Sequence, residues 1–315
     1  MNQLGSQRIA FFFLFDFELN RPVVLTKNQL VDSSIEFSIN GKKTYRKTPF
    51  FAPKDIQLTA KPISQKRYRA AFDLVQKGIL GGDSYLLNLT FPTSIQTNLS
   101  LAEIFHRSQA KYKLLFDDQF VAFSPEIFVR IHNRRIASFP MKGTIDANIP
   151  NAKQLLLNNP KEVAEHATIV DLIRNDLNLV AEKVQVERFQ YIDHLKTAQK
   201  NLLQVSSKVT GVLPKHYPEI IGDILLKLLP AGSISGAPKR KTIEIIQQAE
   251  QQERGYYTGV FGYFDGQNLD SGVLIRFIEQ ANGQTFYRSG GGITANSDCG
   301  QEYQELLDKI YVPIY

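Results

Sequence analysis

The sequence contains a single cysteine, and that scarcity excludes several kinds of protein at once. With Cys299 alone, no disulfide can form within the chain and no metal site can be built from several thiolates. A chain that uses so little cysteine suits a reducing compartment, so we expect a cytoplasmic location.

Long apolar runs are absent as well. No stretch approaches the ~20 residues of a membrane-spanning helix, which predicts a chain without a membrane segment. The apolar segment Phe11–Phe17 contains Asp16 and lacks a small-residue cleavage site. These features favour a buried strand over a signal peptide.

The sequence also lacks a Pro/Ser-rich linker, a charge block and an internal repeat. Its 315 residues would be enough for one large domain or two ordinary ones, and without a linker we expect one domain over residues 1–315. Basic residues exceed acidic ones by 37 − 31 = 6, a mild excess that favours anionic partners. The basic residues are dispersed along the chain, so nucleic-acid binding is not expected.

Hydrophobic periodicity predicts long strands mixed with helices, without regular βαβ alternation, and this pattern is typical of an α+β fold. Helices are expected over residues 65–79, 161–177, 219–229, 239–252 and 300–310. Strands are expected over residues 11–17, 85–91, 112–123, 126–132, 135–139 and 204–213, followed by an antiparallel meander over 257–264, 269–279 and 284–289.

The expected last helix places Glu302, Glu305 and Lys309 on one face. One interpretation is a solvated face, with Glu305 and Lys309 as an i,i+4 ion pair. The other is a pair of carboxylates for a hard cation, with the lysine kept for an anionic ligand.

Glu165 lies on the same helical face as Ile169 and Leu172, so we expect it to be at least partly buried and paired with a cation or a metal. His166 has no second histidine at metal-ligand spacing, which favours a structural histidine. Together with the last helix, Glu165 gives a set of oxygen ligands that suits Mg²⁺ much better than Zn²⁺.

Two glycine-containing segments leave alternatives open. The loop LLPAGSISGAPK, with Gly232 and Gly236, can aim backbone N–H groups at an anion or simply open a helix tightly. The run Gly290, Gly291 and Gly292 is either an anion cradle or a strand-end turn. Arg276 lies within the expected apolar strand GVLIRFI, where a buried guanidinium would be reserved for a planar anion.

Lys142 lies in FPMKGT, between an apolar strand end and Gly143-Thr144. A surface lysine is one interpretation. A nucleophile is the other, and it would need a neutral amine, which burial beside other cations supplies.

Taken together, these segments resemble the chorismate-utilising enzymes, and within them most closely the aminodeoxychorismate synthases (component I). Eight segments over about residues 65–310 carry the resemblance, in family order: GGDSYLLNLT, FSPEIF, FPMKGT, EHATIVDLIRNDL, LLPAGSISGAPK, RGYYTGVFGYF, LIRF and SGGGITANSDCGQEYQELLDKI. The resemblance implies large antiparallel β-sheets packed face to face with helices outside. It assigns residues 65–310 to the catalytic core and residues 1–64 to a short N-terminal portion of the sheet.

The resemblance also implies the ligands. Mg²⁺ would bridge the ring carboxylate of chorismate to Glu165 and Glu305, with Glu302 as a further or neighbouring ligand. The positions that hold substrate carboxylates in the family match Tyr257, Arg276, Gly290, Gly291, Gly292 and Lys309, and Thr144 of the lysine motif is also expected to bind substrate.

Lys142 would attack ring C2 while the C4 hydroxyl departs, because the aminating synthases carry a lysine there and the anthranilate synthases an alanine. Glu126, from the Ser-Pro-Glu motif, would be the general acid, protonated at neutral pH through burial beside Phe123 and Phe128. We expect the two residues on neighbouring strands joined by a turn at 132–135. Ammonia would then attack C4 and release 4-amino-4-deoxychorismate for p-aminobenzoate and folate synthesis.

Two positions depart from the family pattern. Gln204 stands where the family has a histidine tied to pyruvate elimination, and Leu86 stands where isochorismate and salicylate synthases have a water-activating lysine. Gln204 therefore argues against an anthranilate synthase and leaves the amination interpretation largely intact, and Leu86 argues against a hydroxylating enzyme. Anthranilate synthase component I and a non-catalytic paralogue, which binds chorismate or an amidotransferase subunit, are the alternatives. No tryptophan-binding motif is recognised, so feedback inhibition by tryptophan is not expected.

The expected partners follow from the same resemblance. A chain of 315 residues has no room for a fused glutamine amidotransferase or lyase beside the synthase core, and Cys299 has no glutaminase surroundings. We therefore expect ammonia to come from solution or from a separate glutamine amidotransferase subunit, with a separate lyase acting downstream.

Overall fold

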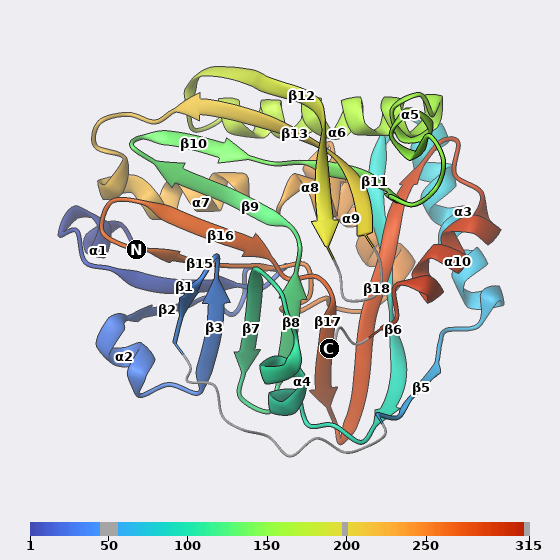
Figure 1. The fold of residues 1–315 in the computed structure, drawn as a ribbon, viewed down its shortest axis with the longest axis horizontal. Coiled ribbons are helices and arrows are strands. Elements are labelled where there is room, and N and C mark those ends of the chain that lie inside the picture. The colour runs from blue at the N-terminus through green and yellow to red at the C-terminus, as the bar shows by residue number, and fades with distance from the viewer. Residues whose placement is uncertain (45–55, 197–200, 312–315) are drawn as a thin grey trace. The chain divides into compact units, whose positions relative to one another are not determined.

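The computed structural model describes residues 1–44, 56–196 and 201–311. Part of the expected N-terminal portion, residues 45–55, lies outside the described residues. In the described chain the strands form two antiparallel sheets accompanied by helices (Figure 1), which confirms the α+β class. None of the helices in these ranges is long and apolar enough to cross a membrane.

The helices are α1 (Asn2–Ser6), α2 (Lys27–Val31), α3 (Gln65–Leu80), α4 (Leu101–Arg107), α5 (Ala152–Leu157), α6 (Pro160–Asn178), the 3₁₀ helix η1 (Tyr217–Ile220), α7 (Ile221–Leu228), α8 (Gly232–Ser235), α9 (Lys239–Glu250) and α10 (Cys299–Asp308). The strands are β1 (Phe11–Phe15), β2 (Val23–Thr26), β3 (Ile35–Ile39), β4 (Lys42–Lys43), β5 (Leu58–Lys61), β6 (Leu86–Thr97), β7 (Tyr112–Phe116), β8 (Phe120–Ser124), β9 (Ile127–His132), β10 (Arg135–Ser138), β11 (Met141–Asp146), β12 (Glu182–Lys196), β13 (Asn201–Val212), β14 (Gly236–Ala237), β15 (Val260–Phe264), β16 (Leu269–Val273), β17 (Phe277–Ala281) and β18 (Gln284–Thr294).

The chain divides into two compact units. The first unit comprises residues 1–11, 126–233 and 263–271, and the second comprises residues 12–125, 234–262 and 272–315. The single catalytic domain expected over residues 1–315 stays a prediction.

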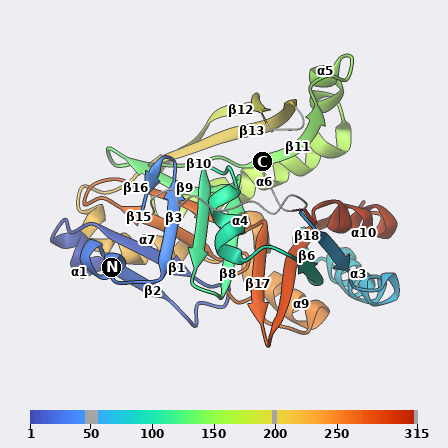
Figure 2. The ribbon, with the colours of Figure 1, turned by 60° about the horizontal axis from the view of Figure 1, so that its bottom comes forward.

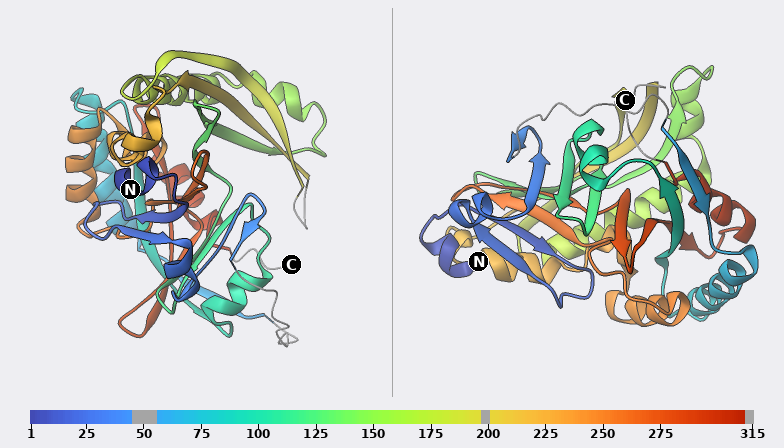
Figure 3. Two further views of the ribbon diagram at one scale, coloured as in Figure 1. Left: turned by 90° about the vertical axis from the view of Figure 1, so that its left-hand side faces the viewer. Right: turned by 90° about the horizontal axis from the view of Figure 1, so that it is seen from below.

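In the first unit, the strands follow the order β11-β13-β10-β9-β16, and β12 also pairs with β13. Helix α6 packs against β11, β12 and β13, and Figure 3 shows it lying along the long, curved β12–β13 pair. The turn at 132–135 joins β9 to β10, whereas β11 pairs with β13. The expectation that this turn joins the strands of Glu126 and Lys142 is therefore wrong, because two strands separate β11 from β9 in the sheet.

In the second unit, the strands follow the order β14-β6-β18-β17-β8-β7-β3-β4, and β5 also pairs with β6. Helices α3 and α10 lie beside β6 and β18 (Figure 2). Helix α3 begins where the Ser64 side chain accepts a hydrogen bond from the Arg67 N–H, and its apolar stripe is buried. Helix α3 therefore forms where the periodicity predicts it.

Two expected strands differ in the structure, and one of the two interpretations of the glycine run is excluded. Residues 112–123 form two strands, β7 and β8. The expected strand 269–279 is broken between β16 and β17, where Arg276 adopts a left-handed φ of 54°. Residues 290–292 are not a strand-end turn, since they continue β18 and pair with β6.

Candidate active site

Lys142 lies on β11, at an irregularity in the pairing of β11 with β13. The register runs Lys142 opposite Val205 and then Thr144 opposite Gln204, with Gly143 left over as a bulge. Gly143 has a φ of +70°, which suits glycine and few other residues. The positive φ at the bulge therefore explains why a glycine follows the lysine. The extra residue also changes which way the neighbouring side chains point.

The amine of Lys142 binds a carboxylate on helix α6. Lys142 Nζ lies 2.7 Å from Glu165 Oε2, and the two side chains are 23% and 8% exposed. The prediction that Glu165 is buried on the stripe of Ile169 and Leu172 is confirmed. The partner of Glu165 in the first unit is the Lys142 ammonium group. The sequence had left open whether this partner would be a cationic side chain or a metal ion.

The next residue of α6, His166, binds the second strand of the same unit. Its Nε2 lies 2.6 Å from the hydroxyl of Ser207 on β13. Burial, together with the nearby charge of Lys142, lowers the pKa of His166 to about 4. His166 is therefore neutral at pH 7, and the structural role expected from the sequence stays a prediction.

Glu126 lies just before β9 and borders a hollow in the first unit. The Ser233 hydroxyl donates a hydrogen bond of 2.5 Å to Glu126 Oε1. Phe128, Ile173 and Leu177 contribute apolar walls to the hollow, and Asp176 adds a second carboxyl group, so the setting of Glu126 is mostly but not wholly apolar on the unit's own side. Such a setting suits a proton donor.

Thr144 and Gln204 contact each other across β11 and β13. The Gln204 amide donates to the Thr144 hydroxyl at 3.3 Å. Gln204 therefore lies one register position from Lys142, and its side-chain amide offers no acid or base at neutral pH.

In the second unit, α10 brings two carboxylates above β18. A Cβ atom built on Gly291 would lie 3.3 Å from both Glu302 Oε2 and Glu305 Oε1, so the two carboxylates converge over this glycine and a methyl group there would have to displace them slightly. The Ser297 hydroxyl donates to Glu302 at 2.7 Å, and Lys309 lies 2.6 Å from Glu305. The expected helical face of two glutamates and a lysine is confirmed.

This pair of carboxylates fits a hard cation by its chemistry, since all its donors are oxygens and the space over Gly291 is kept clear by the glycine. Within residues 1–44, 56–196 and 201–311, no group of three or more His, Cys, Asp or Glu side chains is arranged to hold a metal. Glu302 and Glu305 belong to the second unit and Glu165 to the first. Joint ligation by all three stays a prediction.

The backbone of β18 presents polar groups along one edge beside this pair. Gly290 pairs with Thr90 of β6, and Gly292 pairs with Asn88. The Gly290 carbonyl accepts a hydrogen bond from Lys309 Nζ at 2.7 Å, so it faces away from β6. In an antiparallel strand the N–H and C=O of one residue face the same way, and so do those of its second neighbour. The N–H groups of Gly290 and Gly292 therefore face the edge that β6 does not occupy.

Tyr257 and Arg276 lie in the same unit. Burial raises the pKa of Tyr257 to about 12, so its hydroxyl stays protonated and can donate a hydrogen bond. Arg276 Nε donates to the Tyr311 hydroxyl at 3.2 Å, and both Tyr257 and Tyr287 contribute to its electrostatic surroundings. Its place in a bend, and not within a strand, directs this guanidinium toward phenols.

One polar network in the second unit was missed by the sequence reasoning. Glu250 and Arg254 form a buried ion pair of 2.6 Å at the end of α9. Glu250 continues the buried stripe of Ile245, Ile246 and Ala249. The stripe argument that identified Glu165 would have found Glu250 as well.

The sequence profile described as chorismate binding enzyme matches residues 11–314 of the chain. This protein therefore belongs to the family of chorismate binding enzymes.

Individual relatives agree with this membership. The chain is 52% identical over 313 residues to an uncharacterized PabA-like protein of Haemophilus influenzae, with 99% of this chain and 95% of that protein covered. It is 32% identical over 299 residues to aminodeoxychorismate synthase component 1 of Escherichia coli, where the alignment covers 86% of this chain and 63% of that one. The fold is similar to that of MenF, the menaquinone-specific isochorismate synthase of Escherichia coli, with a TM-score of 0.75, 17% identity, and coverage of 98% and 78%. This last likeness concerns the fold alone.

Proposed function

We propose that this protein aminates chorismate at C4 with ammonia and so forms 4-amino-4-deoxychorismate, through a covalent intermediate on Lys142. The observation that carries the proposal is the position of Lys142. The residue lies on β11 at the glycine bulge, and its amine is 2.7 Å from the buried carboxylate of Glu165 on α6. The family membership supplies the substrate class.

The proposed reaction consists of two substitutions. In the first a group is added at C2 and lost from C4, and in the second a group is added at C4 and lost from C2. Lys142 is paired with an anion and not with the cations that would favour a neutral amine, so in the first substitution its ammonium group must lose a proton to solvent before it reacts. The neutral amine then forms a bond to C2, the ring double bonds shift, and the C4 hydroxyl leaves as water with a proton from Glu126. In the second, ammonia forms a bond to C4, the double bonds shift back, the C2–N bond to Lys142 breaks, and a proton from the new ammonium group returns to Glu126. The sum exchanges chorismate and ammonia for aminodeoxychorismate and water, and no oxidant is needed.

Other residues would bind and orient the substrate. Tyr257 and Arg276, with the N–H groups of Gly290 and Gly292, offer donors for a carboxylate. Glu302 and Glu305, and Glu165 by the family resemblance, would hold Mg²⁺. A bound Mg²⁺ would neutralise part of the charge of the ring carboxylate and fix its position.

We further propose that ammonia comes from a separate glutamine amidotransferase subunit and that a separate lyase releases p-aminobenzoate. The relative from Escherichia coli is named a component 1, which supports a partner subunit.

Anthranilate synthesis is the second candidate. It requires a proton to be handled during pyruvate loss, and the residue beside Lys142 at the family's histidine position is Gln204, whose amide can neither take up nor give up a proton at neutral pH. A non-catalytic protein that binds chorismate is the third candidate.

The decisive experiment is product analysis of purified protein with chorismate, ammonium and Mg²⁺. We expect aminodeoxychorismate, and p-aminobenzoate after addition of aminodeoxychorismate lyase. Anthranilate fluorescence without any lyase would show the second candidate to be right, and absence of turnover would favour the third.

A pair of lysine variants tests the covalent step. We expect Lys142→Ala to lower the rate of amination at least about 100-fold, because the nucleophile is removed. Lys208→Ala is the matched control, because Lys208 lies on β13 of the same sheet and pairs with Glu187 at 2.7 Å. Equal rates in the two variants would contradict a covalent Lys142 intermediate.

A further inference from the structure

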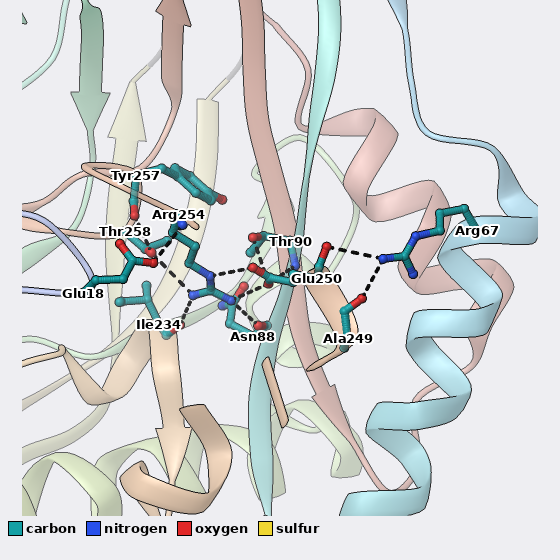
Figure 4. A network of polar contacts seen from close by, with 10 residues as sticks. All are labelled: Glu18, Arg67, Asn88, Thr90, Ile234, Ala249, Glu250, Arg254, Tyr257 and Thr258. Carbon is teal, nitrogen blue, oxygen red and sulfur yellow. Dashed lines mark hydrogen bonds and ion pairs between the residues drawn. The ribbon is translucent and has the colours of Figure 1, made fainter. Parts of the chain in front are cut away.

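A buried ion pair occupies a gap in the sheet of the second unit. Along its edge away from β18, strand β6 pairs with β14 at residues 86–87 and with β5 at residues 94–97. Between these two short partners, β6 would leave backbone groups unpaired. The side chains of Glu250 and Arg254 occupy that interval (Figure 4).

Arg254 and Glu250 satisfy the backbone of β6 as a strand would. Arg254 Nη2 donates to the Asn88 carbonyl at 2.6 Å, and Glu250 Oε1 accepts from the Thr90 N–H at 2.9 Å and from the Thr90 hydroxyl at 3.0 Å. The two side chains are 1% and 0% exposed. Contacts of this kind are strong because they are charged and shielded from water.

The residues that the pair holds are the partners of the glycines proposed to bind substrate. Thr90 is opposite Gly290, and Asn88 is opposite Gly292. These glycines are the two whose N–H groups face the opposite edge of β18, beside Lys309. In each cross-strand pair, the ion pair therefore holds the residue on β6. The glycine on β18 directs its N–H group toward the candidate site.

Arg254 also holds the other segments of this region. Its Nη1 donates to the Ile234 carbonyl at 3.0 Å and to the Thr258 hydroxyl, while Glu18 accepts from the Arg254 N–H at 2.9 Å. Thr258 follows Tyr257 directly in the chain. Figure 4 shows Arg254 between Glu18 and Glu250, with Tyr257 beside it.

We infer that Glu250 and Arg254 are a positioning pair for the carboxylate-binding part of the site: they fix Thr90 and Asn88, and through them the N–H groups of Gly290 and Gly292, and they fix the segment of Tyr257. The inference deepens the proposed function and rests on it for the identity of the carboxylate. The pair does not touch substrate, so its loss should weaken binding and leave the chemical step unchanged.

Thr90 offers a mild test, since its variants change one contact of the pair. We expect Thr90→Val to raise KM and the dissociation constant for chorismate about threefold or more with kcat within twofold, while Thr90→Ser, which keeps the hydroxyl, behaves as wild type. Thr93→Val is the matched control, because Thr93 is also buried on β6 and its hydroxyl has no hydrogen-bond partner among the residues that the structure describes. We expect it to bind chorismate within twofold of wild type.

Glu250→Gln is the stronger variant, with an expected loss of at least tenfold in chorismate affinity measured by calorimetry in the presence of Mg²⁺. Hydrogen exchange of the ligand-free full chain provides a readout that needs no substrate. We expect amides of residues 289–293 to exchange at least tenfold faster in Glu250→Gln and measurably faster in Thr90→Val, but not in Thr93→Val. If Glu250→Gln does not fold, the Thr90 series decides.

The outcomes separate the two proposals. If exchange and affinity in Thr90→Val equal those of Thr93→Val, or if Thr90→Ser is as weak as Thr90→Val, the positioning role is wrong. If chorismate binds and the variants behave as expected but no aminodeoxychorismate forms, the amination proposal fails and the positioning role stands. A wild-type chain that does not bind chorismate overturns both.

Discussion

At the scale of one residue, His166 on helix α6 makes the stability of the folded chain depend on pH. Its pKa in the folded protein is about 4, against an ordinary value of 6.5, because burial and Lys142 disfavour the charged ring. Between these two pH values the unfolded chain binds a proton that the folded chain does not. The contribution of His166 to stability is therefore full above pH 6.5 and is lost as the pH falls toward 4.

We predict that this effect amounts to about 3 kcal/mol across the window. Urea unfolding of wild type and His166→Gln at pH 7.5 and pH 4.5 measures it as the difference between the two proteins, since the other groups titrate in both. The glutamine keeps a hydrogen-bonding group for Ser207. Equal pH dependence in the two proteins would contradict the prediction.

Ser233 gives a second prediction at this scale. Because its hydroxyl holds the Glu126 carboxyl group, Ser233→Ala should lower kcat about tenfold and leave KM within twofold. Ser138→Ala is the control, since Ser138 lines the same hollow but donates to the Phe128 carbonyl. A kcat that falls equally in both variants would assign the effect to the hollow in general and not to Glu126.

Among elements, strand β18 shows why neighbouring glycines need separate treatment. A Cβ on Gly290 would lie 2.3 Å from the Leu89 carbonyl oxygen, which is fixed backbone, whereas a Cβ on Gly291 would meet carboxylate oxygens at 3.3 Å. The first contact strains the sheet and the second displaces side chains from the candidate cation site.

We therefore predict opposite results for two variants of this strand. Gly290→Ala should lower the free energy of unfolding by on the order of 3 kcal/mol. Gly291→Ala should lower it by less than about 1 kcal/mol but raise the Mg²⁺ concentration needed for half-maximal activity about tenfold. Urea unfolding and Mg²⁺ titration measure the two effects. A Gly291 variant with an unchanged Mg²⁺ requirement would argue against a cation at Glu302 and Glu305.

The sequence predicts elements well where periodicity is local. The buried stripe of α3 and the buried Glu165 of α6 follow directly from helical spacing. It predicts them poorly where backbone conformation or long-range pairing decides. A glycine run is typical of a turn, yet residues 290–292 pair in register with β6, and the apolar run around Arg276 hides a left-handed bend.

The candidate site shows the same division. The motifs identify Lys142 and Glu126, which the structure places in the first unit. Motif spacing cannot tell that β11 pairs with β13, because that pairing joins segments about 60 residues apart. The Ser233–Glu126 contact spans 107 positions and leaves no periodic trace.

At the scale of the whole molecule, ligand binding should stabilise the folded chain by mass action. Chorismate at 100 times its dissociation constant should add about 2.7 kcal/mol to the free energy of unfolding and raise the Tm by several degrees. If Mg²⁺ bridges substrate and carboxylates, chelation of Mg²⁺ should abolish most of this rise. Thermal unfolding with chorismate, with and without EDTA, measures it, and EDTA without chorismate is the control. An equal rise in the presence of EDTA would contradict the bridge.

The five hydrogen bonds that the Arg254 guanidinium donates limit which substitutions this protein can accept. Arginine is the side chain with five donors in a planar fork, so no single replacement at position 254 preserves the set. A change at position 250 alone leaves a buried guanidinium without its counter-charge. Positions 250 and 254 are therefore expected to change together. A substitution at only one of them should give a less stable protein.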